Sequence, residues 1–286
     1  MVRTVTPPPA KYGSPVQLLL LALCSGVLLL MVSWAEVGRG AASREAGEEA
    51  EGGRRDAGRA GGGRTRAGGA EGEFVYSEHT GRTRADEEFF YRELGRGDGS
   101  TAILFLHGMR FTSADWLEPV DLMGEIATRA GVSRAIAIDL PSFGKSPALP
   151  DRSAGARAAF VGGAIEALQG QRGPARWIIV SPSMSGSWSL PFLHQVAEES
   201  PVVGFIPVAI VLPRQPYDVT LDVRTLAVFG EDDIKLVADE PRLPEFYGNW
   251  ELLSIPDADH AAYLDQPEAF VDAVVPFIRD VLSSVT

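Results

Sequence analysis

The 286-residue chain has one cysteine, four histidines and fewer basic than acidic residues. A single cysteine, Cys24, cannot form an intrachain disulfide, and the few histidines show no metal-ligand spacing. The 26 lysines and arginines against 38 acidic residues give a net charge of −12, the wrong sign for a surface that neutralises phosphates. We therefore predict no metal, no cofactor and no nucleic-acid partner.

The N-terminal region contains one long uncharged segment, residues 16–35. About 20 apolar residues in a helix cross a ~30 Å hydrocarbon core, so a transmembrane signal anchor is predicted here, after a short segment at 1–15. A signal peptide cleaved near Ala35 is the alternative. Both interpretations put the rest of the chain outside the cytoplasm, in the ER or Golgi lumen or at the cell exterior, as a single-pass membrane protein or as a secreted one.

Residues 36–72 consist almost entirely of glycine, alanine, arginine and acidic residues. Such a composition cannot build a hydrophobic core and predicts a disordered linker. The folded domain is therefore expected in residues 73–286. The charges of the linker cancel, so this domain carries about −14, and by long-range steering it should attract cationic substrates.

Within residues 73–286, short apolar runs alternate with longer segments that fit amphipathic helices. This rhythm predicts an α/β fold with a mainly parallel sheet and helices on both faces. The expected strands lie at 89–94, 101–108, 135–141, 177–183, 202–211, 225–233 and 251–260. The expected helices lie at about 114–130, 153–169, 185–198, 240–247 and 267–283. In such a sheet, ligands bind beyond the carboxyl ends of the strands.

A serine stands at the apex of a predicted strand-turn-helix. In the sequence Ser-Pro-Ser-Met-Ser-Gly, Ser183 occupies the nucleophile position of the G-x-S-x-G elbow, with Ser181 and Ser185 in place of the two glycines. Three alternating serines also occur by chance, and a serine-rich helix cap is the competing interpretation. Ser183 is therefore a candidate nucleophile that needs an acid and a histidine further along the chain.

His260 is the only histidine after residue 194, and it ends a strand-like segment. This order, serine then acid then histidine, is that of the α/β-hydrolase triad. The acid should follow the preceding strand, where the sequence is Gly-Glu-Asp-Asp. We predict Asp233, three residues after the glycine, with Asp232 as the alternative; either acid is also a candidate helix cap.

Two backbone N–H groups should hold the oxyanion of the acyl-transfer intermediate. One is expected from Met184, next to the nucleophile, and the other from Met109, in the loop that follows Gly108. His107 opens this loop and is interpreted as an organiser of the loop rather than a base. His194 is interpreted as a packing or surface histidine.

The motifs together resemble the alpha/beta-hydrolase domain-containing protein 14 family over about residues 87–284. They are Leu-His-Gly-Met-Arg-Phe at 106–111, the Asp139 loop at 139–146, Val-Ser-Pro-Ser-Met-Ser-Gly at 180–186, Leu-Pro-Phe-Leu at 190–193, the segment 204–209 and the segment 260–268. The resemblance implies an α/β-hydrolase fold with the triad Ser183, Asp233 and His260. It also implies a serine hydrolase active on small acyl esters. The segment at 16–35 resembles that of the anchored A form; the soluble B form is linked to removing acetyl groups from lysine and passing them to coenzyme A.

The chain departs from the family pattern at two places. Ser142 replaces a usual glycine, and the loop at 210–213 is more apolar than usual. Only 13 residues, 212–224, separate two expected strands where many lipases insert a cap, so we expect no cap domain and an open site. Such a site suits short acyl groups better than a long lipid tail.

The sequence therefore predicts a membrane-tethered serine esterase or deacylase that cleaves short acyl esters or acylated side chains of a protein through an acyl-enzyme. A non-catalytic interaction protein with the same fold is one alternative, and an acyltransferase that uses a thiol acceptor is another. A haloalkane or epoxide hydrolase needs an aspartate in place of Ser183. The sequence does not indicate the oligomeric state.

Overall fold

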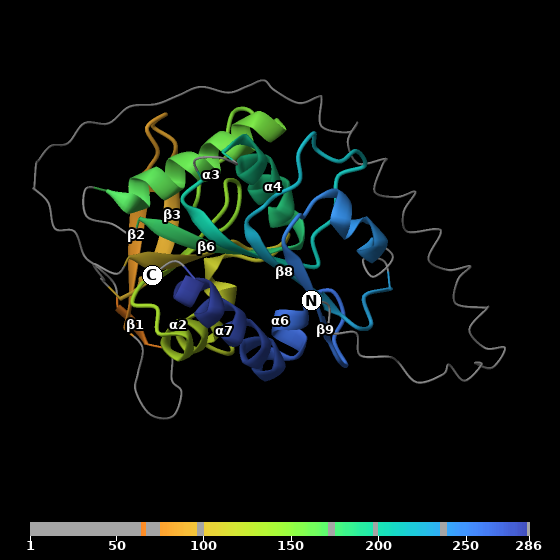
Figure 1. The fold of residues 1–286 in the computed structure, drawn as a ribbon. Helices are drawn as coiled ribbons and strands as arrows, with labels where there is room; N and C mark the ends of the chain where they lie inside the picture. The colour runs from red at the N-terminus through yellow and green to blue at the C-terminus, as the bar shows by residue number, and fades with distance from the viewer. Residues whose placement is uncertain are drawn as a thin grey trace, which may run out of the picture. The chain divides into compact units, whose positions relative to one another are not determined.

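A mixed sheet of nine strands forms the centre of the computed structural model over the residues that it describes, with the order β1-β2-β3-β5-β4-β6-β7-β8-β9 (Figure 1). The described residues are 64–66, 75–95, 100–170, 175–196, 200–234 and 239–284, and all lie in one unit of the chain, 59–286. The strands are β1 (Arg64–Arg66), β2 (Val75–Arg82), β3 (Glu88–Leu94), β4 (Thr101–Phe105), β5 (Ala135–Ile138), β6 (Arg176–Pro182), β7 (Val202–Val208), β8 (Arg224–Gly230) and β9 (Trp250–Ile255). In the sheet order β5-β4-β6-β7-β8-β9 all neighbouring strands are parallel. The pairs β1–β2, β2–β3 and β3–β5 are antiparallel.

Helices cover both faces of the sheet, as predicted. The α-helices are α2 (Leu122–Ala130), α3 (Ala154–Gln169), α4 (Gly186–Gln195), α6 (Ala262–Asp265) and α7 (Pro267–Ser284). Figure 1 shows α3 and α4 on one face and α2, α6 and α7 on the other. Short 3-10 helices are η3 (Ser113–Trp116), η4 (Ser183–Ser185) and η5 (Glu240–Glu245). The chain therefore has the α/β-hydrolase fold.

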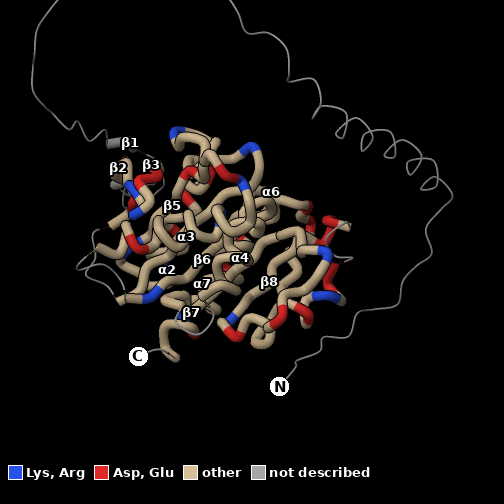
Figure 2. The backbone as a smooth tube through the Cα atoms, turned by 90° about the horizontal axis from the view of Figure 1, so that it is seen from above, with Lys and Arg blue, Asp and Glu red and all other residues tan. Residues whose placement is uncertain are grey.

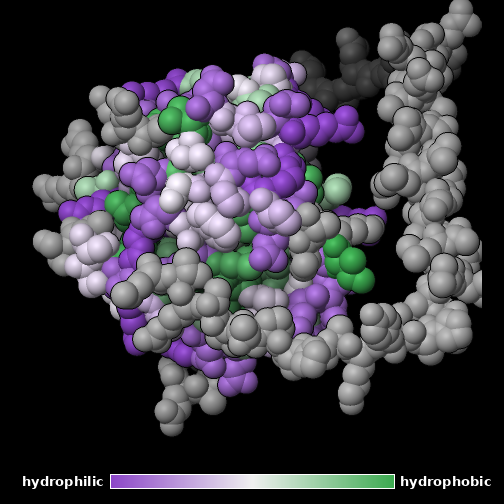
Figure 3. Space-filling model, turned by 45° about the vertical axis from the view of Figure 1, so that its right-hand side comes forward, coloured by the Kyte–Doolittle hydropathy of each residue, from purple (hydrophilic) through white to green (hydrophobic). Residues whose placement is uncertain are grey.

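Strand β6 shows why the central strands read as continuous apolar runs. Successive side chains of a strand point to opposite faces of the sheet. Trp177 and Ile179 belong to the core on the α3 and α4 side, whereas Ile178 and Val180 belong to the core on the α2 and α7 side. Because both faces are buried, these four positions favour apolar residues. The surface outside these layers is mostly hydrophilic on the face shown in Figure 3.

The connections place the ends of β4 and β6 side by side. Strand β4 is followed along the chain by β5 on one side and then by β6 on the other, so the order of the strands reverses at β4. Phe105 is paired with Val180 in this parallel pair, and Leu106 N–H continues the ladder by donating to the Val180 carbonyl at 2.9 Å. Ligands of open α/β sheets bind beside such a reversal. The loop after β4 and the turn after β6 therefore face each other.

Several elements differ from their predicted form. The helix predicted at 114–130 is divided into η3 and α2, and the one at 240–247 is the 3-10 helix η5, which contains Pro244. Strand β2 was not predicted, because five of its eight residues are polar and its pattern resembles a loop. β1 lies within the predicted linker, 36–72, and pairs with β2. The rest of that linker, like the segments at 1–15 and 16–35, lies outside the described residues.

The connection between β7 and β8 is short. Residues 209–223 are all described and contain no helix or strand of their own. A cap inserted at this point would need a folded subdomain, and the segment does not form one. The carboxyl ends of the strands are therefore not covered by a cap from this connection, as the sequence predicted.

Candidate active site

Ser183 lies at a sharp turn between β6 and α4. Its φ of +50° is in the left-handed region, which an L-residue adopts only where the surroundings enforce it. This strained conformation is a property of the nucleophile elbow of α/β hydrolases, where it exposes the hydroxyl above the sheet. The side chain of Ser183 is partly exposed, whereas Ser181 and Ser185 on either side are buried. Only the middle serine of the three is therefore available to a substrate.

His260 lies between Ser183 and Asp233. Its Nε2 is 2.7 Å from Ser183 Oγ, and its Nδ1 is 2.8 Å from Asp233 Oδ2. The carboxylate is buried, with 5% of Asp233 exposed, whereas 45% of the histidine side chain is exposed. The geometry fits the neutral tautomer in which Nδ1–H donates to the carboxylate and Nε2 accepts from the serine hydroxyl. The structure therefore brings together the three residues that were predicted as the triad.

Asp232, the alternative acid, takes a different place. Its side chain is exposed, and its backbone N–H donates to the Ala258 carbonyl at 2.9 Å. No contact between its carboxylate and His260 occurs among the described residues. Asp233, not Asp232, is therefore the acid that contacts the histidine.

Gly230 explains how the acid and the histidine meet. A Cβ at this position would lie 2.2 Å from the Asp259 carbonyl oxygen and 2.3 Å from that of Ala258. Only glycine allows the loop with His260 to approach the end of β8 so closely. The Asp233 N–H then donates to the Gly230 carbonyl at 3.1 Å, which closes the turn that carries the acid.

A buried set of serines lies beneath the elbow. Ser181 Oγ is 2.9 Å from Ser185 Oγ and 2.8 Å from Ser189 Oγ, and all three side chains are fully buried. Ser185 Oγ donates to the Pro182 carbonyl at 2.7 Å, and Ser189 Oγ donates to the Ser185 carbonyl at 3.2 Å. The two positions that are glycines in G-x-S-x-G are thus filled by hydroxyls that bond to one another. Ser189 was not singled out from the sequence, although its spacing of four from Ser185 is the helical signal that would have found it.

The loop after β4 passes directly beside the nucleophile. A Cβ on Gly108 would lie 3.5 Å from Ser183 Cβ, so the backbone of this loop is within contact distance of the elbow. Met109 follows with 62% of its surface exposed, and the Phe111 N–H closes a turn on the Gly108 carbonyl at 3.2 Å. Met184 follows Ser183 in η4. The two predicted oxyanion residues, Met109 and Met184, therefore directly follow Gly108 and Ser183, which lie within contact distance of each other.

His107 joins two loops and does not face the triad. Its Nδ1 lies 2.9 Å from the Gly108 carbonyl, and its Nε2 accepts from the Leu140 N–H at 2.9 Å. Because the ring is fully buried, desolvation lowers its pKa. A neutral ring with Nδ1–H as donor satisfies both contacts. This arrangement agrees with its interpretation as a loop organiser.

Asp139 forms a second connection between the same loops. Its buried carboxylate accepts from the Ser113 N–H at 2.7 Å, from the Ser113 hydroxyl at 2.6 Å and from the Lys145 N–H at 2.8 Å. Gly144, at φ +53°, packs so closely that a Cβ there would lie 2.0 Å from Asp139 Oδ2. Together with His107, this aspartate fixes the positions of the loops that follow β4 and β5.

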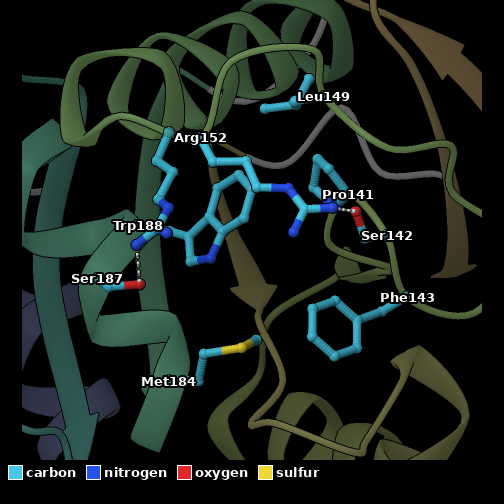
Figure 4. A pocket seen from close by; sticks show the side chains of 9 residues that line it. Pro141, Ser142, Phe143, Leu149, Arg152, Met184, Ser187 and Trp188 are labelled. Atoms are coloured by element: carbon cyan, nitrogen blue, oxygen red, sulfur yellow. Dashed lines mark hydrogen bonds between the residues drawn. The ribbon is translucent and has the colours of Figure 1, made fainter. Parts of the chain in front are cut away.

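A pocket of about 210 Å³ opens beside the elbow. Its walls come from the loop after β5, from the start of α3 and from the start of α4. Figure 4 shows Met184 and Phe143 on one side, the indole of Trp188 in the middle and the side chain of Arg152 reaching toward Ser142. The sequence did not single out the pocket arginines, because nothing in the chain order relates the start of α3 to the elbow.

His194 lies away from the triad, on α4. Its ring stacks on Tyr217, with 3.7 Å between the ring centres and 17° between the planes. Its Nε2 is buried and has no hydrogen-bond partner among the described residues, and burial lowers its pKa to about 4. This agrees with its interpretation as a packing histidine.

The fold and the Ser183–His260–Asp233 contacts define a protein of the α/β-hydrolase class. Among solved structures, a predicted CIB-like hydrolase from Thermoplasma acidophilum has a TM-score of 0.62 at 23% identity, covering 72% of this chain and 99% of the other. The esterase RhEst1 from Rhodococcus sp. has a TM-score of 0.58 at 16% identity, covering 71% and 99%. At such identities the likeness shows the fold.

Curated relatives define the family more narrowly. Protein ABHD14A of Rattus norvegicus is 33% identical over 205 residues, which cover 70% of this chain and 81% of the relative. The human protein named "Putative protein-lysine deacylase ABHD14B" is 32% identical over 201 residues, covering 68% and 91%. No protein-family model matches the chain. The chain belongs to the ABHD14 family, that is, to the alpha/beta-hydrolase domain-containing protein 14 proteins.

The predicted localisation needs correction. The membrane span predicted at 16–35 lies outside the described residues, and no helix within the described ranges is long and apolar enough to cross a bilayer. The relatives match about 70% of the length of the chain. These findings contradict the predicted localisation as a single-pass, extracytoplasmic or secreted protein.

Proposed function

We propose that the chain is a serine hydrolase that cleaves short acyl esters or acylated side chains through an acyl-enzyme. The proposal rests above all on the chain of contacts Ser183 Oγ to His260 Nε2, at 2.7 Å, and His260 Nδ1 to Asp233 Oδ2, at 2.8 Å. We place the catalytic domain in residues 73–286, with β1 as an additional edge strand of its sheet.

The first half of the reaction forms the acyl-enzyme. Ser183 Oγ attacks the carbonyl carbon of the substrate while its proton moves to His260 Nε2. Asp233 keeps Nδ1 protonated and stabilises the imidazolium that forms. The tetrahedral intermediate collapses as the same proton is given to the leaving alcohol or amine. Its oxyanion is held by the backbone N–H groups of Met109 and Met184.

The second half repeats these steps with water. His260 takes a proton from the water, whose oxygen attacks the acyl carbon, and the imidazolium then returns that proton to Ser183 Oγ as the bond to the acyl group breaks. The products are the free acid and the regenerated enzyme. The proposed reaction steps use only the triad, the two backbone N–H donors, the substrate and water.

The size of the substrate follows from the pocket and the missing cap. A pocket of about 210 Å³ accommodates a short acyl or small leaving group, and the β7–β8 connection contributes no helix above it. The name of the human relative, "Putative protein-lysine deacylase ABHD14B", supports acylated lysine as one substrate class. We therefore propose acyl groups of a few carbons rather than long lipid chains.

Labelling with a fluorophosphonate probe tests the proposal. The wild-type chain should react at one site and lose the label in Ser183→Ala, and a panel of esters from acetyl to palmitoyl should show the highest kcat/KM for the shortest members. Labelling with normal strength in Ser183→Ala would disprove the assigned nucleophile. No labelling of the folded wild type would favour the non-catalytic interaction protein.

A further inference from the structure

The pocket beside Ser183 contains two arginines that lack an acidic partner. Arg152 and Arg157 both line it, and neither forms an ion pair with a carboxylate within the described part of the chain. Each guanidinium is instead held by a neutral hydroxyl. Arg157 Nη1 donates to Ser187 Oγ at 3.0 Å, and Arg152 Nη2 donates to Ser142 Oγ at 3.4 Å. A guanidinium has five N–H donors, so most remain available to a ligand.

The acid next to Arg152 in the sequence, Asp151, forms no ion pair with either arginine among the described residues. Asp151 precedes Arg152 in the chain, but its carboxylate accepts from the Ser153 N–H at 2.8 Å and from the Ser153 hydroxyl at 2.9 Å. These bonds lower the pKa of Asp151, and the side chain is fully exposed. Its charge is therefore directed to the N-terminal cap of α3, where Ser153 is the capping residue.

The position of the two arginines, one in the first turns of α3 and one just before it, is electrostatically unfavourable on its own. Arg157 lies near the N-terminus of this 16-residue helix and Arg152 just before it, and the first turn contains no acidic residue. Because the N-terminus of a helix is the positive end of its dipole, cations are disfavoured there and anions are favoured. An anion in the pocket would be attracted by the helix end and by both guanidinium groups.

Ser142 supports the same interpretation. Its φ of +75° lies in the left-handed region, which favours glycine, yet a serine occupies the position and its hydroxyl accepts from Arg152. Strained residues of this kind persist where the surroundings enforce them, and they gather at ligand sites. Here the strained residue places the oxygen that orients a guanidinium in the pocket.

The remaining lining of the pocket is apolar. It consists of Pro141, Phe143, Leu149, Met184 and Trp188, and the Arg157 guanidinium lies 5.6 Å from the centre of the Trp188 ring. Figure 4 shows Trp188 lying between the Met184 side and the Arg152 side chain. A ligand with a short methylene chain and a terminal negative charge would match this division into an apolar and a cationic part.

The charge of the pocket is opposite to that of the domain. Residues 73–286 carry about −14, which favours cationic molecules at long range. Figure 2 shows acidic and basic segments interspersed along the chain, with several acidic segments near β8. At the pocket, however, the charged residues of the lining are both arginines. The domain as a whole therefore attracts cations at long range, whereas the pocket beside the nucleophile favours an anionic group at contact distance.

From these observations we propose that the pocket binds a carboxylate of the substrate, held between Arg152 and Arg157 while the adjacent acyl carbon faces Ser183. This inference rests on the proposed hydrolase function and narrows its substrates to esters or amides that carry a second, anionic group. Bidentate pairing with carboxylates is a property of arginine that neutral ester substrates cannot use.

Two matched pairs of esters test it and locate the charge. The 4-nitrophenyl half-ester of glutaric acid is compared with 4-nitrophenyl valerate for a charge on the acyl group, and 4-acetoxybenzoate with phenyl acetate for a charge on the leaving group. After subtraction of spontaneous hydrolysis, kcat/KM should be at least ~10-fold higher for the anionic member of one pair. The pair that shows the preference identifies the part of the substrate that carries the carboxylate.

Variants of the two arginines connect the preference to the pocket. In Arg152→Gln and Arg157→Gln, the ratio of kcat/KM between the anionic and the neutral ester should fall by about 3-fold each, and in the double variant by about 10-fold, to a value near 1. Arg214→Gln removes an exposed arginine that does not line the pocket and should leave the ratio unchanged. Equal ratios in all variants, or no preference in the wild type, would overturn the inference.

A binding measurement separates this inference from the proposed function. Monomethyl glutarate is titrated calorimetrically into Ser183→Ala and into the triple variant that also carries Arg152→Gln and Arg157→Gln, and at least ~10-fold weaker binding is expected in the latter. If binding depends on the arginines but no ester is hydrolysed by the wild type, the pocket assignment stands and the hydrolase proposal fails. If neutral esters are hydrolysed through Ser183 and the two variants bind monomethyl glutarate equally, the hydrolase proposal stands and the assignment of the pocket as a carboxylate site fails.

Discussion

The Nε2 atom of His260 lies 2.7 Å from Ser183 Oγ, although 77 positions separate the two residues in the chain. Ser183 is placed by the turn after β6, and His260 by the loop after β9, at the far end of the sheet order. Both lie beyond the carboxyl ends of parallel strands, so the same edge of the sheet presents them. The glycine at 230 then allows the loop with His260 to approach the acid-bearing turn closely.

Replacing the middle serine should remove activity, whereas its neighbours should matter mainly for stability. Ser183→Ala is expected to lower kcat by about 10³-fold or more, because no other hydroxyl among the described residues contacts His260. Ser181→Ala and Ser185→Ala should keep much of the activity but lose about 1–3 kcal/mol of unfolding free energy, since each leaves buried partners without a hydrogen bond.

Ester kinetics and urea denaturation of the three serine variants measure both effects. A loss of labelling in Ser181→Ala with labelling retained in Ser183→Ala would place the nucleophile elsewhere in the elbow.

The two adjacent acids should differ sharply. Asp233→Asn is expected to lower kcat by about 10⁴-fold, because the amide does not stabilise the required tautomer and the imidazolium. Asp232→Asn removes one negative charge at the neighbouring, exposed position and should change kcat by less than about 3-fold. The pair is compared by steady-state kinetics at neutral pH. If the larger loss occurred in Asp232→Asn, the acid would be assigned to the wrong residue.

Acid should destabilise the fold in part through His194. Burial lowers its pKa from 6.5 to about 4, so the unfolded chain takes up the proton first as the pH falls. The stability that depends on the neutral ring is fully present above pH 6.5 and is lost as the pH decreases toward 4. Between pH 7 and pH 5 this amounts to about 1–2 kcal/mol.

His194→Phe is the matched variant, because a phenyl ring can keep the stacking on Tyr217 without a titrating nitrogen. Its unfolding free energy should depend less on pH over this interval than that of the wild type. Part of the dependence should remain, since burial also lowers the pKa of His107. Identical slopes for wild type and variant would show that His194 titrates normally in the folded state.

Asp139→Asn should unfold more easily although the residue lies outside the triad. Its two oxygens accept three hydrogen bonds, from Ser113 and Lys145, and the amide group of asparagine would present a donor to one of these donors. The expected loss is about 2–3 kcal/mol in urea denaturation. Asp218→Asn, at an exposed position of the β7–β8 connection, should stay within about 0.5 kcal/mol of the wild type. Equal stability of both variants would show that Asp139 does not hold the two loops.

The central strands could be predicted from the sequence because their residues are buried on both faces of the sheet. Strands such as β4 and β6 contain almost only apolar residues, and no alternative structure accounts for such short continuous runs between helices. Strand β2, near the edge of the sheet, could not be predicted. Strand β2 exposes polar side chains and is held by pairing with β3, a partner that its own sequence does not reveal.

The candidate triad residues could be narrowed to one serine, one histidine and two adjacent acids from the sequence, because chain order and strand ends restrict the candidates. One histidine follows residue 194, and it lies at a strand end, as does the acid three residues after Gly230. The steric need for that glycine became visible only with the loop of Asp259 in place, where a side chain would collide with two carbonyl oxygens.

The sequence by itself determined the fold class and indicated Ser183, His260 and either Asp233 or Asp232 as candidate site residues, because burial patterns and chain order can be followed along the chain. Only the tertiary structure decided that Ser181, Ser185 and Ser189 share one buried network, and that Arg152 and Arg157 face a pocket beside the nucleophile. These relationships depend on the packing of α3 and α4 over the sheet. Contacts between segments that meet only through packing leave no periodic signal in the chain.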